Sequence, residues 1–430
     1  MPGAGVGDIR DPQLAEPARE AAELGLCEHC LGRCFARVDF GYGNDERGRI
    51  LVEEHDLETT TPEECHVCEG LMGRVDRMRD VVEADLAGWA FDTFLVGTRV
   101  PPDVLEREEM VWEAIGAEDT ESAKSELNRE IGKQVEARHS GIGRENWTVE
   151  FDGPDVNAVL DTRFDHVDHV HKSLFIYGRY RKHVRGIPQT RWPCRNCRGT
   201  GCTECGASGL NYILSVEDLV AAPAKQATGA SEATFHGAGR EDVDARCLGS
   251  GRPFVLELPD PRRRFVNLDV LRRAITTCAA PAVSVSELAF VDKDAVSEVK
   301  GHRGRKTYAA EVAFEDPVPT ETLFKVSDML EGTQVAQRTP SRVAHRRADK
   351  TRHRDVTRCL LVHRRDDGLQ ARFLLQGDAG LYIKELVSGD EGRSDPSLAG
   401  LLDVGARCTA LDVVDVGGPS ALDATIRAEE

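Results

Sequence analysis

Four cysteines in the segment CRNCRGTGCTECG constrain the fold of this chain more than any other feature of its sequence. They form a C-x2-C-x4-C-x2-C pattern, made by Cys194, Cys197, Cys202 and Cys205. Each C-x2-C pair can direct two thiolates at one point, and the glycines between the pairs allow the tight turns that close a tetrahedron. The pattern predicts a structural zinc site with four thiolate ligands and no open coordination position.

Two further cysteine pairs lie near the N-terminus. The motif CEHC contains Cys27 and Cys30, and the motif CHVC contains Cys65 and Cys68. The two pairs are far apart in sequence, so only the fold can bring them together. They predict a second structural zinc site. Alternative ligands lie close by in the sequence: Cys34, His29 and His66.

The N-terminal stretch MPGAGVGDIRDPQLAEP lacks the apolar run of a secretory signal, and no segment is long enough to span a membrane. We therefore expect a cytoplasmic protein without a membrane partner. Thirteen cysteines in a reducing compartment are poor candidates for disulfides, which favours metal binding.

Acidic residues outnumber lysine and arginine by 74 to 55, which gives a formal net charge of -19. Because lysine is also scarce, the composition is similar to that of proteins whose surfaces stay hydrated in the strong salt of a halophile's cytoplasm. An acidic protein of ordinary salt preference is the alternative. The net charge argues against a polyanionic partner. Whether the chain can bind a polyanion therefore depends more on where the basic residues lie than on their number.

Residues 172–203 contain no acidic residue. Their cations are Lys172, Arg179, Arg181, Lys182, Arg185, Arg191, Arg195 and Arg198. Tyr177, Tyr180 and Trp192 are interleaved and offer planar faces for bases beside cations for phosphates. A solvated surface is the plainer interpretation of such a run.

A second basic run, RTPSRVAHRRADKTRHRDVTR, spans 338–358 and includes Arg346 and Arg347. Two such runs in an acidic chain favour a nucleic-acid-binding surface. RNA is preferred to DNA because no helix-turn-helix or finger spacing is present. Candidate RNA-binding residues are Arg179, Arg181, Lys182, Arg346 and Arg347.

Hydrophobic periodicity divides the chain into three parts. Residues 1–75 hold the first cysteine pairs, and residues 76–212 alternate helical and strand-like patterns, as in a small α/β RNA-binding module that ends in the four-cysteine pattern. Residues 213–430 begin with SVED, a capping box that opens a helix. Runs of strands with few helices follow, which indicates an α+β domain on a mixed, mainly antiparallel sheet.

Strands are predicted from short β-branched or alternating apolar runs. These runs are TFLVGTRV, VNAVLDTRF, SLFIYGRY, PFVLELPD, AVSVSELAFV, TYAAEVAF, RCLLVHRR and ARFLLQGD. Helices are predicted from amphipathic patterns. These are DPQLAEPAREAAELGLC, RVDRMRDVVEADLAGWAF, NLDVLRRAITTC and TETLFKVSDML. No heptad repeat indicates a coiled-coil oligomer, so we expect a monomer.

The glycine-flanked loop GREDVDAR contains three carboxylates, Glu241, Asp242 and Asp244. A carboxylate beside an arginine in such a loop serves as a helix cap, a metal ligand, a general base, a nucleophile or one half of a surface ion pair. A metal ligand is disfavoured because no histidine cluster follows. Local chemistry alone leaves the other roles open.

The segment GREDVDARCLGSGRPFVLEL resembles the catalytic motif of the tRNA pseudouridine synthases that modify the T arm in archaea, a family with a eukaryotic branch. The resemblance extends to GRKTYAAEV, QRTPSRVAHRRADK, GLYIKELVSGDEGRSDPS and the upstream FIYGRYRKHVRGIPQTRWPCRNCRGTGC. The N-terminal cysteine pairs are similar to those of the family's THUMP-containing accessory domain. The resemblance implies an isomerase acting on tRNA uridines 54, 55 or both.

The resemblance also implies residue roles. Asp242 corresponds to the nucleophile and Arg240 to its partner, with Asp244 as the rival carboxylate. Tyr308, in the Lys-x-Tyr strand, corresponds to the tyrosine that stacks on the target base. The YIKE motif supplies its own tyrosine and basic residue, Tyr382 and Lys384.

Isomerising uridine requires breaking the N1–C1′ bond, turning the base and rejoining it through C5, without redox change or external group. No organic cofactor is expected. Asp242 either attacks C1′ or promotes elimination to a glycal, and the sequence does not choose between these routes. Two other functions stay open: a non-catalytic zinc-containing RNA-binding protein, and a THUMP-linked tRNA methylation or thiolation enzyme.

Overall fold

The protein is described by a computed structural model that covers residues 7–139, 146–346 and 348–428. The chain divides into two compact units. One comprises residues up to 172 together with 262–265, and the other comprises 173–261 and the residues from 266 onward. Within the described ranges, every helix is too short or too polar to cross a bilayer.

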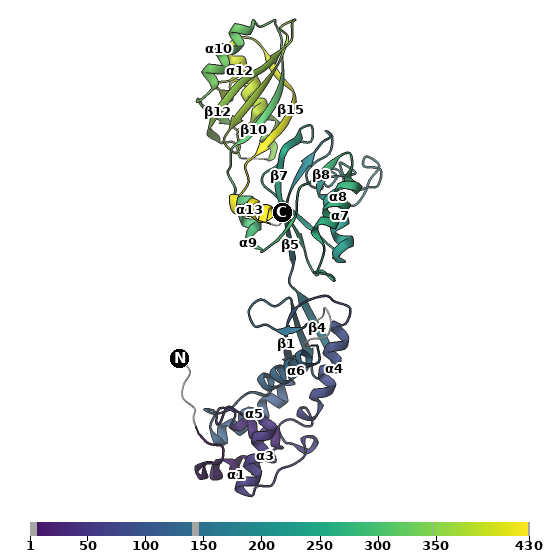
Figure 1. The fold of residues 1–430 in the computed structure, drawn as a ribbon, viewed down its shortest axis with the longest axis vertical. Coiled ribbons are helices and arrows are strands. Elements are labelled where there is room, and N and C mark those ends of the chain that lie inside the picture. The colour runs from purple at the N-terminus through teal and green to yellow at the C-terminus, as the bar shows by residue number, and fades with distance from the viewer. Residues whose placement is uncertain (1–6, 140–145, 347, 429–430) are drawn as a thin grey trace. The chain divides into compact units, whose positions relative to one another are not determined.

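Helices form most of the N-terminal unit (Figure 1). They are α1 (Ala15–Glu23), α2 (Glu28–Cys34), α3 (Asn44–His55), α4 (Val75–Leu86), α5 (Pro102–Ile115) and α6 (Ala123–His139), with short 3-10 turns at Pro12–Leu14, Pro62–Glu64 and Met72–Arg74. Helices α2 and α3 cross at two glycines. A Cβ on Gly32 would lie 1.8 Å from the Asn44 carbonyl oxygen, and one on Gly48 would lie 1.9 Å from that of Glu28. Only glycine permits this close crossing.

A four-stranded sheet with the order β2-β1-β3-β4 completes the N-terminal unit. Its strands are β1 (Thr93–Arg99), β2 (Thr148–Val149), β3 (Val156–Asp161) and β4 (His166–His171). Strand β1 is parallel to both neighbours, and β3 and β4 are antiparallel. Helices α4 and α6 contact this sheet and bury alternate residues of β1, as the period-2 pattern predicted.

The C-terminal unit is built on an eleven-stranded sheet with the order β14-β11-β12-β13-β10-β15-β7-β5-β8, with β6 paired to β7 and β9 to β5. Its strands are β5 (Leu174–Lys182), β6 (Thr234–Gly237), β7 (Arg246–Leu258), β8 (Val283–Val285), β9 (Ala289–Val291), β10 (Lys306–Phe314), β11 (Gln334–Arg338), β12 (Thr351–Arg364), β13 (Gln370–Gly377), β14 (Ser394–Asp395) and β15 (Ala406–Val416). Every pairing is antiparallel except β15 with β7. The predicted α+β class with a mixed, mainly antiparallel sheet is confirmed.

Helices of the C-terminal unit cover both faces of this sheet. They are α7 (Val216–Thr228), α8 (Leu268–Ala279), α9 (Asp294–Gly301), α10 (Thr320–Leu330), α11 (Ile383–Ser388), α12 (Leu398–Leu402) and α13 (Ser420–Ala428), with a 3-10 turn at Ser341–Arg346. Helices α7 and α8 pack against one face of β5 and β7, while α9 and α13 pack against the other. In Figure 1, α10 and α12 lie beside β10, β12 and β15. The predicted capping box is present, because Ser215 and Asp218 each accept the other's backbone N–H.

The run AVSVSELAFV forms two short strands rather than the single strand predicted. Ser286 interrupts it: its backbone N–H donates to the Arg179 carbonyl, and its hydroxyl accepts from the Arg179 N–H. The chain bends there, and Leu288 packs onto Gly178, where an added Cβ would lie only 2.6 Å from the leucine. Tertiary contacts thus override the continuous strand pattern. The boundaries predicted at residues 75 and 212 stay a prediction. Strand β5, which lies within the predicted 76–212 module, belongs to the C-terminal unit.

Candidate active site

The loop 239–245 connects two strands that pair with each other, β6 and β7. Ala238 donates its N–H to the Pro253 carbonyl, and Ala245 donates to the Asp242 carbonyl, so the loop is fixed at both ends. Gly239 has a φ of 74°, a left-handed conformation that favours glycine. The loop therefore presents Asp242 from a rigid hairpin.

Two cations hold the Asp242 carboxylate. Arg342 Nη1 lies 3.0 Å from Asp242 Oδ2, and Lys384 Nζ lies 3.4 Å from the same oxygen. Arg342 comes from the 3-10 turn after β11, and Lys384 comes from the first turn of α11. The site is thus assembled from three distant segments. The structure brings the two predicted residues Asp242 and Lys384 together.

Asp244 is more open to solvent than Asp242, with 70% of its side chain exposed against 33%. Its oxygens accept hydrogen bonds of 2.7 and 2.9 Å from Lys384 Nζ. Partial burial acts to raise the pKa of Asp244, but the contact with Lys384 outweighs it, so the pKa lies below the ordinary value. Lys384 therefore bridges the two carboxylates.

Arg342 was not among the residues singled out from the sequence. Its Nε donates to Glu385 Oε1 at 2.6 Å, and Glu385 is nearly buried. This contact fixes the guanidinium so that Nη1 faces Asp242. The sequence placed Arg342 in the basic run 338–358, but several other arginines lie in the same run, so this signal alone could not identify it as a site residue.

A buried charged layer lies beneath the loop. Arg252 Nε is 2.9 Å from Glu241 Oε2, and both side chains are at most 2% exposed. The Tyr180 hydroxyl donates to Glu241 Oε2 at 2.8 Å, and Arg252 Nη1 donates to the Ala238 carbonyl at 2.8 Å. This layer fixes the residue directly before Asp242 in the chain.

Lys182 belongs to the same layer and is fully buried. Its ammonium donates to the carbonyls of Ile187 and Asp242 at 2.9 and 3.2 Å, and it lies 3.6 Å from Glu241 Oε1. Tyr177 is also fully buried, as is Tyr180. The interpretation of these two tyrosines as stacking faces for bases is wrong, because neither ring reaches solvent.

Arg240 lies with its guanidinium over the indole of Trp192, 4.5 Å from the ring centroid. Gln189 supports the same side of the loop, since its Nε2 donates to the Gly239 carbonyl at 3.0 Å and to the Tyr180 hydroxyl at 2.8 Å. The loop is therefore held from outside by the segment that leads into the four-cysteine pattern.

The two predicted tyrosines occupy different positions. Tyr308 lies on β10 and is 9% exposed, and burial raises its pKa. Tyr382 caps the N-terminus of α11. Its N–H donates to Gln337 Oε1 at 2.8 Å, while its carbonyl accepts from Gln337 Nε2 at 3.0 Å. Because burial raises the pKa of Tyr308, its phenol is neutral at physiological pH.

The remaining predicted cations are distributed between the surface and the interior. Arg179 is mostly buried and pairs with Asp423, at 3.0 Å between Nε and Oδ1. Arg181 is partly exposed and donates from Nε to the Gly249 carbonyl at 2.6 Å. Arg347 lies outside the described residues, and only the backbone of Arg346 is described, in the 3-10 turn.

Both four-cysteine sets come together. In each, the four Sγ atoms lie within 4.8 Å of one another. Sulfur pairs at 3.7–3.9 Å occur in both clusters. A tetrahedron with Zn–S bonds of about 2.3 Å has S···S edges of about 3.8 Å. The thiolates of both clusters therefore fit a tetrahedral metal ion, and the alternatives Cys34, His29 and His66 lie outside the set.

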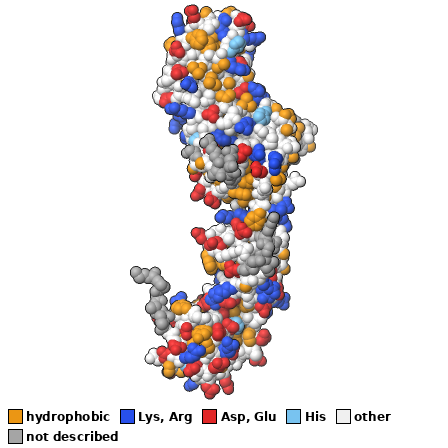
Figure 2. All heavy atoms as spheres, viewed as in Figure 1, with side chains coloured by type: hydrophobic (Ala, Val, Ile, Leu, Met, Phe, Trp, Pro, Cys, Tyr) orange, Lys and Arg blue, Asp and Glu red, His pale blue; other side chains and the backbone are white. Residues whose placement is uncertain are grey.

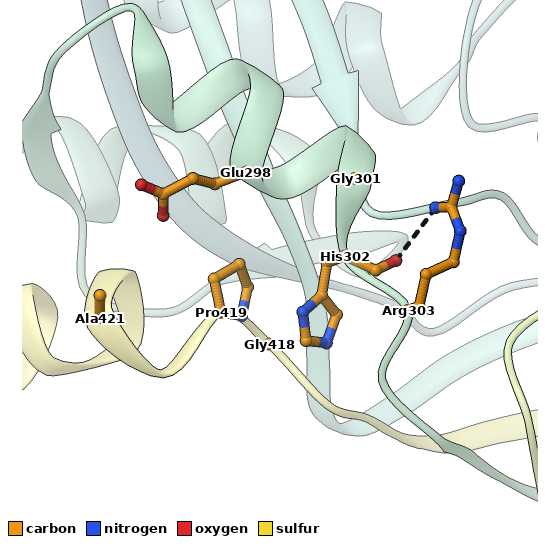
Figure 3. A pocket seen from close by; sticks show the side chains of 7 residues that line it. All are labelled: Glu298, Gly301, His302, Arg303, Gly418, Pro419 and Ala421. Atoms are coloured by element: carbon orange, nitrogen blue, oxygen red, sulfur yellow. Dashed lines mark hydrogen bonds between the residues drawn. The ribbon is translucent and has the colours of Figure 1, made fainter.

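One hollow, of about 560 Å³, lies at the end of α9 and the start of α13 (Figure 3). It is lined by Glu298, Gly301, His302, Arg303, Gly418, Pro419 and Ala421. The side chain of Arg303 bonds to the His302 carbonyl there. No residue of the loop 239–245 lines this hollow, so it is separate from the Asp242 site.

Comparison with known proteins identifies the family of the chain. A family model described as the C-terminal part of Pus10 matches residues 175–417, and an archaeal Pus10 THUMP domain model matches residues 78–161. Proteins named tRNA pseudouridine synthase Pus10 are similar over nearly their whole lengths. The relative from Halorubrum lacusprofundi is 46% identical, over 94% of this chain and 96% of its own. The one from Methanothrix thermoacetophila is 42% identical, over 94% and 95%.

Solved structures are more distant. A chain of a Cbf5-Nop10-Gar1 complex covers 46% of this chain and 44% of its own, with 20% identity and a TM-score of 0.27, too slight a likeness to bear on function.

The family models and the relatives identify a pseudouridine synthase, an enzyme of the isomerase class, with a THUMP domain before its C-terminal domain. This class replaces the two alternatives, a non-catalytic RNA-binding protein and a methylation or thiolation enzyme. The chain belongs to the Pus10 family. The family resemblance found in the sequence is confirmed.

Proposed function

We propose that this protein converts uridine to pseudouridine at positions 54 and 55 of the T arm of tRNA, with Asp242 as the nucleophile. The observation that supports this most is the ion pairing of Asp242 with both Arg342 and Lys384, on a loop fixed by the buried Glu241–Arg252 pair. A carboxylate fixed in orientation is suited to attack at a sugar carbon.

The reaction needs no more than the groups at this site. Asp242 either forms a bond to C1′ as the N1–C1′ bond breaks, or removes a proton from C2′ to give a glycal. The detached uracil turns on Tyr308 and bonds to C1′ through C5, as Asp242 leaves C1′ or returns the proton to C2′. The proton on C5 then passes to N1. Arg342 and Lys384 orient the carboxylate, whereas Asp244, mostly exposed, serves to position Lys384. We assign Lys182 to holding the loop, because it is buried.

We further propose that tRNA binds across the exposed arginines near the loop. Arg191, Arg195, Arg198 and Arg240 are exposed, and Arg181 is partly exposed. Acidic and basic side chains are interspersed on the face drawn in Figure 2. A net charge of -19 is therefore compatible with a local group of arginines that binds phosphates. A monomeric, cytoplasmic enzyme is our further expectation, since the sequence has no heptad repeat of a coiled-coil oligomer.

The test of this function uses tRNA transcripts and detection of pseudouridine by a specific label and mass spectrometry. We expect product in an unmodified tRNA at positions 54 and 55. A transcript with cytidine at both positions is the matched control and should yield none. Product elsewhere with none in the T arm would refute the proposed position while leaving the enzyme class intact.

Zinc is the metal that we propose for both clusters, because four thiolates at tetrahedral spacing are its usual structural ligands. We expect two zinc ions per chain in protein purified without chelator. Cys197→Ser and Cys65→Ser should each remove one, while Cys278→Ser, at an exposed cysteine outside both clusters, should remove none. Atomic absorption measures the content, and unchanged zinc in Cys197→Ser would contradict the assignment.

A further inference from the structure

Two lysines beside the catalytic loop, Lys182 and Lys306, differ in the polar contacts of their ammonium groups. Lys182 has two carbonyl acceptors and a nearby carboxylate, as described above. Lys306, at the start of β10, is partly buried. Within the described part of the chain, its ammonium has neither a hydrogen-bond acceptor nor an ion-pair partner. A partly buried charge without a partner costs free energy.

Lys306 lies next to the loop that carries Asp242. A Cβ added to Gly239 would lie 2.9 Å from Lys306 Nζ and 3.4 Å from Arg252 Nη1. Lys306 and Tyr308 are two residues apart on one strand, so their side chains project from the same face. The unpaired ammonium therefore lies beside the catalytic loop, on a residue that shares its strand face with the tyrosine proposed to hold the base.

The surroundings of Lys306 are short of negative charge. The charged and titratable groups that act on it come from β7, from the catalytic loop and from the segment before β10: Arg252, Cys247, Glu241, His302 and Arg303. Glu241 is the one carboxylate among them, and it already pairs with Arg252. Burial, followed by the charge of Arg252, lowers the pKa of Lys306 to about 8.

We propose that Lys306 binds an anionic oxygen of the substrate in the Asp242 site. This rests on the proposed function. The oxygen has two possible sources. One is a backbone phosphate next to the target uridine. The other is a uracil carbonyl oxygen, which gains charge when N1 leaves C1′ with the bonding electron pair.

The step balances without a proton from Lys306. In the attack route, an Asp242 oxygen bonds to C1′ and the electron pair of the broken bond passes to uracil, delocalised over N1, O2 and O4. In the glycal route, Asp242 takes the C2′ proton and the same pair passes to uracil. In both routes the ammonium offers charge alone. When C5 bonds to C1′, the Asp242 oxygen leaves C1′ in the attack route, or Asp242 returns the proton to C2′ in the glycal route. The proton on C5 then passes to N1.

The test compares Lys306→Met with Lys182→Met in the full chain. Lys306→Met should lower kcat/KM about 30-fold or more, an order of magnitude typical of a charged contact to the reacting group. It should leave the thermal midpoint unchanged or raise it by about 2 °C, because an uncompensated charge is removed. Lys182→Met should lower the midpoint, since it leaves the Ile187 and Asp242 carbonyls without their donor and removes a cation beside Glu241.

The kinetic constants identify the source of the oxygen. A phosphate is bound in the ground state, so its loss raises KM; charge on uracil exists only in the transition state, so its loss lowers kcat. Activity of the unaltered enzyme should also fall as pH rises through about 8, and Lys306→Arg should move that fall to higher pH.

Full activity in Lys306→Met overturns the inference. A drop in activity accompanied by a drop of several degrees in the midpoint also overturns it, since Lys306 would then be structural. Asp242→Asn separates this result from the proposed function: if that variant remains active while Lys306→Met does not, the nucleophile is wrong and the lysine site stands.

Discussion

Asp242→Asn is expected to abolish pseudouridine formation, with a loss of about 10³-fold or more in kcat. Asparagine keeps the size and shape of the side chain but removes the negative charge that attacks carbon or takes a proton. The contacts of the residue with Arg342 change, whereas the buried Glu241–Arg252 pair beneath it is untouched. Single-turnover assays on a T-arm transcript measure the loss.

Asp244→Asn is the matched control, since Asp244 lies on the same loop and also contacts Lys384. It should retain activity within about tenfold, as expected for a positioning group. Binding of tRNA should persist in both variants, which gel shift can verify. If Asp244→Asn is inactive and Asp242→Asn is not, the roles of the two carboxylates are exchanged.

Arg252→Met should have the largest effect on stability. It leaves Glu241 buried with only Lys182 and Tyr180 as partners, and breaking a buried ion pair from one side costs about 3–5 kcal/mol. Because Glu241 precedes Asp242, activity should fall as well. Denaturant unfolding measures the difference in free energy.

Arg246→Met is the comparison for this variant. Arg246 pairs with Asp412 at 2.6 Å, but its side chain is 38% exposed, so its loss should cost about 1 kcal/mol or less. Replacing Glu241 and Arg252 together by leucine and methionine should recover part of the lost stability. Equal costs for Arg252→Met and Arg246→Met would show that the layer under the loop contributes no special stability.

The sequence was most informative where chemistry is local. The cysteine spacing predicted both clusters, and the capping box at Ser215 and the strand β10 lie where the patterns placed them. The run AVSVSELAFV failed as a single strand because its bend depends on contacts with Arg179 and Gly178, which no local pattern records.

The site was harder to predict because its charged side chains pair with residues that are distant in the sequence. The basic run 172–203 indicated a surface, yet Lys182 lies inside beneath the loop. Arg342 could not be told apart from neighbouring arginines, since only the turn after β11 brings it to Asp242, 100 residues away in sequence. The sequence shows which charged side chains are present, but their ion-pair partners depend on the tertiary fold.

The single parallel pairing in the large sheet has a consequence for how the enzyme becomes competent. Strands β15 and β7 share only two registered pairs, and the main chains come so close that a Cβ on Gly249 would meet the Val414 carbonyl at 1.8 Å. Asp242 precedes β7 on one side of this seam, while Arg342 and Lys384 belong to the other. Neither half-sheet alone holds all three of these side chains. The site is therefore complete only when segments distant in the sequence dock along this narrow junction.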